Sequence, residues 1–150
     1  MIKTFNYLFV TFFGIGTIRY APGTITSLIT TVLLYSLFHI INFSSDVILL
    51  SLFLIFLYSF YAVGEYIKES ENKDPKEVVI DEVIGQSIPI YLYEIAHGSE
   101  KNSQEVILFY IYIFVLFRFF DIKKPFPVNF FDKKFKNSFG VILDDVIAGL

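Results

Sequence analysis

Two pairs of adjacent acidic residues lie in otherwise apolar stretches of this 150-residue sequence. The first pair, Asp81 and Glu82, lies in VVIDEVIGQSI, and the second, Asp144 and Asp145, lies in GVILDDVIAG. Carboxylates in apolar surroundings cost free energy unless they are paired or bind a metal ion. One such pair alone also fits a plain helix N-terminus, where negative charge is favourable. Two pairs exceed what helix ends require, and they predict a functional site.

A third motif, FRFFDIKKPFP at residues 117–127, supplies cations. Arg118 and Asp121 are three residues apart on one face of a predicted helix, and Lys124 follows. An arginine here could hold phosphate through two hydrogen bonds. The alternative is a structural ion pair between Arg118 and Asp121, with the lysines anchoring the segment at lipid headgroups.

A fourth motif is the turn RYAPGT at residues 19–24. Arg19 provides a cation, and Thr24 is a possible N-cap of the helix that follows Pro22 and Gly23. The free N–H groups of such a helix start could receive an anion. A plain turn with a helix cap explains the same residues.

The chemistry that these motifs share is phosphate ester hydrolysis with a magnesium ion. Carboxylates without cysteine or clustered histidine suit Mg²⁺ better than zinc or copper. Arginine and lysine can neutralise a phosphoryl group while the metal activates water. The absence of cysteine excludes thiol-based phosphatases. The sequence has no D-x-D motif for a phospho-aspartate route, and we interpret the two histidines, His39 and His97, as incidental.

The composition indicates that the elements carrying these residues meet lipid. Hydrophobic residues make up 55% of the chain and charged residues 18%, with a mean hydropathy of +0.61. Residues 20–45 and 47–64 contain no charged side chain, and either stretch is long enough to cross a bilayer. Residues 108–117 form a weaker candidate, because Arg118 follows at once. The net charge of −3 argues against nucleic acid as a partner.

Apolar periodicity predicts a single all-α domain, residues 1–150, built as a compact bundle of about six helices, several of them membrane-spanning or membrane-embedded. The predicted helices cover residues 4–13, 25–41, 46–69, 78–96, 104–122 and 140–150. Pro125 and Pro127 should end the fifth helix. The last segment is too short to cross a membrane, and we expect the C-terminal helix to be truncated.

The distribution of Lys and Arg predicts which side of the membrane the motifs face. The connections at 42–45 and 97–103 hold almost no basic residues. The connections at 65–77 and 118–136 are rich in basic residues, namely Lys68, Lys73, Lys76, Arg118, Lys123, Lys124, Lys133, Lys134 and Lys136. Basic connections tend to stay in the cytoplasm. Alternating crossings then place both acidic pairs, Asp121 and Arg19 on the cytoplasmic side. The fourth segment carries Glu94, so it either crosses or lies in the interface.

The four motifs, read in order as APGT, IDEVIG, FRFFDIKKPFP and GVILDDVIAG, resemble the phosphatidylglycerophosphatase A family from about residue 14 to the end. The resemblance implies a magnesium-dependent enzyme that converts phosphatidylglycerophosphate to phosphatidylglycerol in the bacterial inner membrane. It also implies a central helix wrapped by others. The family usually has glycine at Thr26, a glycine-rich turn at residues 136–139 and a further helix after DDVIAG.

The positions that match the family motifs give the site hypothesis. We expect the carboxylates of Asp81, Glu82, Asp144 and Asp145 to hold Mg²⁺. The predicted catalytic residues are Asp121, Asp145 and Arg118, with Asp121 either a further metal ligand or the base that orients water. The predicted substrate-binding residues are Arg19, Thr24, Arg118 and Lys124. The rival hypothesis is a non-catalytic membrane protein that binds anionic lipid or transports an ion. An ion path would need charges spread through the membrane depth. The oligomeric state is not predicted.

Overall fold

The computed structural model describes all residues except 1, 71–74, 98–102 and 131–136. Over this described part the chain is helical and contains no strand, which confirms the predicted all-α class. Each predicted segment is found with small shifts at its ends. The helices are α1 Ile2–Val10, the 3₁₀ helix η1 Ile15–Thr17, α2 Pro22–Tyr35, the π-helix η2 Ser36–Ile40, α3 Ser45–Glu69, α4 Ile80–His97, α5 Ser103–Lys123 and α7 Ser138–Gly149.

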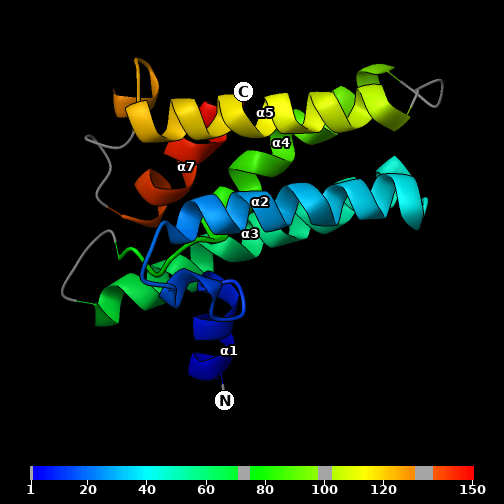
Figure 1. Cartoon of the computed structure of the whole chain (residues 1–150). Coiled ribbons are helices and arrows are strands. Elements are labelled where there is room, and N and C mark those ends of the chain that lie inside the picture. Colours follow the sequence, from blue (N-terminus) through cyan, green and yellow to red (C-terminus); the bar gives the residue numbers. More distant parts are fainter. Residues whose placement is uncertain (1, 71–74, 98–102, 131–136) are drawn as a thin grey trace.

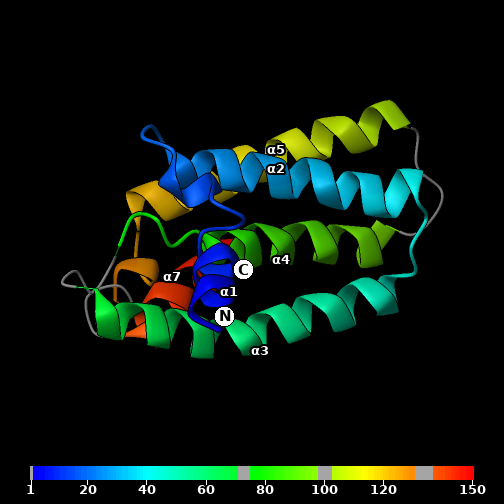
Figure 2. The same cartoon turned by 90° about the horizontal axis from the view of Figure 1, so that it is seen from below.

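Four long helices form the body of the molecule. Figure 1 shows α2, α3 and α5 running in roughly the same lengthwise direction, with α1 projecting away from them at a steep angle. Figure 2 shows α4 between α2 and α3, and α7 near the end where α2 and α4 begin. Because α4 contacts α2, α3, α5 and α7, it is the central helix that the family resemblance implies.

The start of α2 differs from the sequence prediction. Thr24 was predicted as a possible N-cap, but the helix begins at Pro22, with Ala21 as the N-cap residue in a left-handed conformation (φ 47°). Proline is favoured in the first turn because it has no N–H to lose and its φ already suits a helix. Thr24 therefore lies inside the first turn of α2.

The end of α5 agrees with the prediction from the two prolines. The helix ends at Lys123, and Lys124 adopts a left-handed conformation with φ 43°. The Lys124 N–H still donates to the Phe120 carbonyl oxygen at 2.8 Å. This closing turn directs the chain away from α5 just before Pro125.

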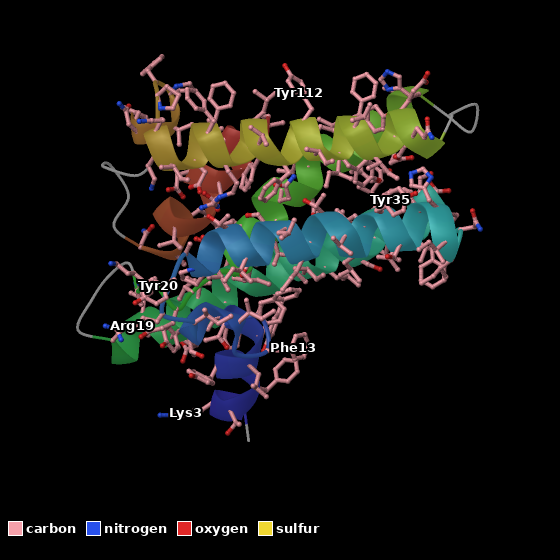
Figure 3. All side chains as sticks on the ribbon, in the orientation of Figure 1. Lys3, Phe13, Arg19, Tyr20, Tyr35 and Tyr112 are labelled. Carbon is pink, nitrogen blue, oxygen red and sulfur yellow. The ribbon has the colours of Figure 1, made fainter. Side chains whose placement is uncertain are left out.

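Within the described residues, two helical stretches are long and apolar enough to cross a membrane, namely Pro22–Ile40 and Ser45–Lys68, with mean hydropathies of 1.5 and 2.3 over an 18-residue window of each. Only 22% of that window in the second stretch is buried inside the bundle, so its apolar side chains mostly face outward. Large apolar side chains also cover the outside of α5, including Tyr112 (Figure 3). Such extensive apolar surface is what contact with lipid requires. The predicted loop residues Lys73, Lys101, Lys133, Lys134 and Lys136 lie outside the described residues.

Candidate metal and phosphate site

The two acidic pairs come together where α7 crosses the beginning of α4. Asp81 and Glu82 lie in the first turn of α4, and α7 contributes Asp145. One carboxylate oxygen from each of these three residues lies within 4.8 Å of the other two. Two residues adjacent in sequence thus meet a third that is more than sixty positions away.

Glycines on both helices permit this close crossing. A Cβ atom on Gly149 would come within 2.3 Å of the Gly85 carbonyl oxygen, and one on Gly85 within 2.7 Å of the Asp145 carbonyl oxygen. No real Cβ can be that close to a backbone oxygen, so any larger residue would push α7 away from α4. Small residues at such a crossing let two helix backbones approach. The crossing therefore sets the distance from Asp145 to Asp81.

Glu82 is directed at a third helix, α2. A Cβ on Gly23 would lie 2.0 Å from Glu82 Oε1, so the carboxylate occupies the space that any other residue at position 23 would fill. Gly23 belongs to the first turn of α2, where the helix dipole favours negative charge. The glycine of the APGT motif therefore leaves the space that the Glu82 carboxylate of the IDEVIG motif occupies.

The crowding of carboxylates disfavours their ionised forms. Burial raises the pKa of Asp81 well above its ordinary value, and the charges of Glu82 and Asp145 raise it further. Burial likewise raises the pKa of Asp145, with Asp121 as the largest charge contribution. The pKa of Glu82 is raised by burial as well, although the hydrogen bond with Asp81 and the charge of Arg118 partly oppose the rise. A bound cation would remove this repulsion.

Two oxygens of the cluster are buried without a hydrogen-bond partner in the described part of the chain, Asp81 Oδ1 and Glu82 Oε2. Buried acceptors without partners are rare in native proteins and call for an unseen water or ion. All candidate ligands are hard carboxylate oxygens, the set that Mg²⁺ prefers. The residues present therefore fit a magnesium ion.

Arg118 and Asp121 lie beside the cluster on α5. Arg118 Nη1 is 2.6 Å from Asp121 Oδ2 and 3.3 Å from Ser27 Oγ on α2. Both charged side chains are largely buried, at 12% and 13% exposure. The predicted ion pair exists, and Asp121 also lies close enough to Asp145 to raise the pKa of that residue. The ion pair thus belongs to the same polar cluster as the carboxylates.

Lys124 and Asp144 form a second ion pair at the edge of the cluster. Lys124 Nζ donates to Asp144 Oδ2 at 2.6 Å, and Asp144 Oδ1 accepts the Asp145 N–H at 3.1 Å. Asp144 is 5% exposed. It lies outside the group of three carboxylates that could share an ion. Its predicted role as a metal ligand remains a prediction.

The residues predicted from the RYAPGT turn do not all reach the cluster. Arg19 lies on the outside of the molecule next to Tyr20, with its guanidinium carbon 5.6 Å from the centroid of that ring (Figure 3). Tyr20 is 74% exposed. Thr24 is half-buried in the first turn of α2, one residue after Gly23. Gly23, which was not predicted as a site residue, makes the direct contact with Glu82.

Sequence reasoning also missed a buried polar layer one turn deeper in the bundle. The side-chain atoms of Gln86 and the hydroxyls of Thr26 and Thr30 are buried without a described partner. Gln86 is four residues after Glu82 and therefore lies on the same face of α4. The available signal was an amide in IDEVIGQ one helical turn after the acidic pair.

The histidines have no part in the carboxylate cluster. His39 Nε2 lies 3.1 Å from Glu94 Oε1 near the opposite ends of α2 and α4, where Tyr110 also donates to Glu94. This contact gives Glu94 local partners within the apolar part of the bundle. His97 contacts the Tyr93 carbonyl oxygen on its own helix.

Comparisons with known proteins identify the family of this chain. The family model for phosphatidylglycerophosphatase A matches residues 8–150. A Haemophilus influenzae protein named phosphatidylglycerophosphatase A is 36% identical over 148 residues, covering 92% of this chain and 78% of the relative. A putative phosphatidylinositol-3-phosphatase from Bacteroides thetaiotaomicron is 30% identical over 140 residues, covering 92% of this chain and 82% of the relative. No solved structure gives a significant match.

The family match spans every helix that contributes to the cluster, from α2 through α7. It confirms the resemblance inferred from the four motifs and the prediction of a phosphatase. The similarity to membrane-lipid phosphatases, together with the two candidate spans, indicates a membrane protein. The chain belongs to the phosphatidylglycerophosphatase A family and is a phosphoric monoester hydrolase.

Proposed function

We propose that this chain hydrolyses phosphatidylglycerophosphate to phosphatidylglycerol and phosphate, using Mg²⁺, at the cytoplasmic face of the bacterial inner membrane. The observation that carries the proposal is the meeting of Asp81, Glu82 and Asp145 within 4.8 Å. Arg118 and Lys124 lie at the same end of the bundle and supply positive charge for a phosphate. The name of the Haemophilus influenzae relative supports the choice of lipid.

In this proposal Asp81, Glu82 and Asp145 hold the magnesium ion. When bound, the ion supplies positive charge to the phosphate oxygens and makes water a better nucleophile at neutral pH. The two buried acceptors, Asp81 Oδ1 and Glu82 Oε2, point to this role because they need a cation or water as partner. Asp144, already bonded to Lys124, supports the cluster from its edge.

The remaining side chains bind the phosphate and move the proton. Arg118 and Lys124 would hold the phosphoryl oxygens by charge-assisted hydrogen bonds. Asp121 would accept a proton from the attacking water as the new P–O bond forms. The bond from phosphorus to the glycerol oxygen breaks, and that oxygen leaves as the hydroxyl of phosphatidylglycerol by taking up the proton that Asp121 received from the water. Arg118 holds Asp121 in position through the 2.6 Å ion pair.

The site lies at one end of the bundle, which argues against the rival hypothesis of an ion path. A conduit needs charged groups through the depth of the membrane. Here the carboxylates gather where α4 begins and α7 crosses it. The basic residues Lys68, Lys76 and Lys123 lie near the same ends of α3, α4 and α5, and such residues favour the cytoplasmic side.

Phosphate release by the purified protein in detergent tests the proposal. The substrates are phosphatidylglycerophosphate, phosphatidylinositol 3-phosphate and a soluble phosphate monoester, each with Mg²⁺ or with chelator. We expect magnesium-dependent release from phosphatidylglycerophosphate at a kcat/KM well above the other two. Preference for the inositol lipid would instead match the activity after which the Bacteroides relative is named. Phosphate release that is unchanged by chelator would contradict the proposed use of Mg²⁺.

A further inference from the structure

An apolar groove runs between α3 and α4 on the outside of the bundle. It has a volume of about 250 Å³ and is open along one side. Its α3 wall is formed by Leu49, Leu52, Phe53 and Phe56, which follow the spacing of one helix face. The only hydroxyl from serine in its lining, that of Ser87, donates to the Val83 carbonyl oxygen at 2.6 Å, so it is satisfied within α4.

The groove begins beside the carboxylate cluster. Its lining includes Ile84, three residues after Asp81, and Val146, the residue next to Asp145. On the α4 side it continues through Ile88 to Leu92. These residues repeat about every four positions, which keeps them on the helix face that starts with Asp81. The near end of the groove thus lies about one helical turn from Asp81, on the same face of α4, although the cluster carboxylates themselves do not line it.

The position of the groove places it at the depth of lipid acyl chains. Its α3 residues lie inside the candidate span Ser45–Lys68. The eight-residue step from Ile84 to Leu92 corresponds to about 12 Å of helix. The groove therefore leads from the phosphate site into the apolar part of the bundle, in the direction that a phospholipid extends from its headgroup.

We propose that this groove binds one acyl chain of the phospholipid whose phosphate is held at the carboxylate cluster. The inference rests on the proposed function, because it assigns the second part of the same substrate. An acyl chain gains little hydrophobic free energy on moving from bilayer to groove, since both surroundings are apolar. The groove acts by shape, through close packing that fixes where the headgroup phosphate lies relative to Asp81 and Asp145.

Filling the groove separates this role from general lipid contact. Leu52→Trp places a larger side chain on the groove wall, and Leu50→Trp makes the same change on the outer face of α3, where Leu50 is 59% exposed and does not line the groove. We expect Leu52→Trp to lower kcat/KM for a dioleoyl substrate by about tenfold. Its kcat/KM for a dihexanoyl substrate should change less than about twofold, and Leu50→Trp should match the original protein on both.

The acyl-chain proposal would be overturned if both tryptophan variants lost kcat/KM equally, or if Leu52→Trp lost kcat/KM equally on both substrates. Either result would leave the proposed function in place. Ile88→Trp on the opposite wall repeats the test if Leu52→Trp fails to fold. A labelling experiment tests the groove even if the protein does not hydrolyse phosphatidylglycerophosphate. A phospholipid with a photoreactive group in its acyl chain should label α3 and α4 residues of the groove in the inactive Asp145→Asn variant. Labelling spread evenly over the outer faces of α3 and α5 contradicts a specific acyl-chain site.

Discussion

Gly149 on α7 lies against the backbone of Gly85 on α4, so that a Cβ at position 149 would be 2.3 Å from the Gly85 carbonyl oxygen. The contact sits one turn beyond Asp145 and one turn beyond Asp81 along their respective helices. It therefore controls how closely the two carboxylates approach. A substitution that leaves every charged residue intact can still open the site.

Gly149→Ala should separate α7 from α4 and lower phosphatase activity by about 100-fold, because small displacements of reacting groups have effects of that size. Gly64→Ala is the matched control, since its Cβ would meet Ser138 Oγ at an ordinary 3.6 Å. The control should retain activity and melt at the same or a higher temperature, because alanine is the better helix former. Activity and thermal unfolding in detergent measure both effects. Full activity in Gly149→Ala contradicts the importance of the crossing.

Asp145→Asn and Asp81→Asn should abolish hydrolysis without unfolding the protein. Each change removes a predicted metal ligand while keeping the size of the side chain. Removing one carboxylate from a repelling cluster should also raise the melting temperature of the metal-free protein. Turnover within about tenfold of the original in either variant would remove that residue from the site.

Lys124→Met should destabilise the fold, because it removes the 2.6 Å ion pair to Asp144, whose side chain is 7% exposed. Breaking a buried pair costs about 3 to 5 kcal/mol, and partial exposure of Lys124 reduces the expected loss to about 2 kcal/mol. Lys68→Met removes the exposed pair with Glu65 and serves as the control. Denaturant unfolding in detergent should separate the two variants. Equal stability of both would show that the Lys124 pair has no structural role.

The pKa values of Asp81 and Asp145 are raised in the folded chain, so without metal the folded state holds more protons than the unfolded state. The contribution of these two carboxyl groups to the stability of the folded state is fully present below about pH 4, the ordinary aspartate pKa. This contribution is lost as the pH rises through their raised pKa values in the folded chain. In the presence of chelator, the melting temperature of Asp145→Asn should therefore exceed that of the original protein by a margin that grows above about pH 4. A margin independent of pH contradicts the raised pKa.

Much of the fold was accessible from the sequence because its signals are local. Uncharged stretches, prolines and apolar spacing placed the helices, with errors mainly at their ends. The start of α2 was missed because Thr24 resembles an N-cap, whereas Pro22 takes the first helical position. The motifs also identified the family, because several separated signatures recur in the right order.

The arrangement within the site depends on contacts between distant segments, which the sequence does not display. Asp144 and Asp145 are adjacent, and only the crossing of α7 over α4 directs Asp145 toward Asp81 and leaves Asp144 with Lys124. The contact of Gly23 with Glu82 and the bond from Arg118 to Ser27 likewise join different helices. Arg19 was predicted from its charge and its place beside the turn before α2, and it lies on the outside beside Tyr20.

The most direct test of the central claim is Mg²⁺ binding at the three carboxylates together with phosphate release from phosphatidylglycerophosphate. Isothermal titration of the metal into purified protein should show saturable binding that Asp145→Asn loses, and the same variant should release no phosphate. The control Gly64→Ala should bind and turn over normally. Saturable binding with unchanged affinity in Asp145→Asn, or lipid hydrolysis at full rate in that variant, would contradict the account.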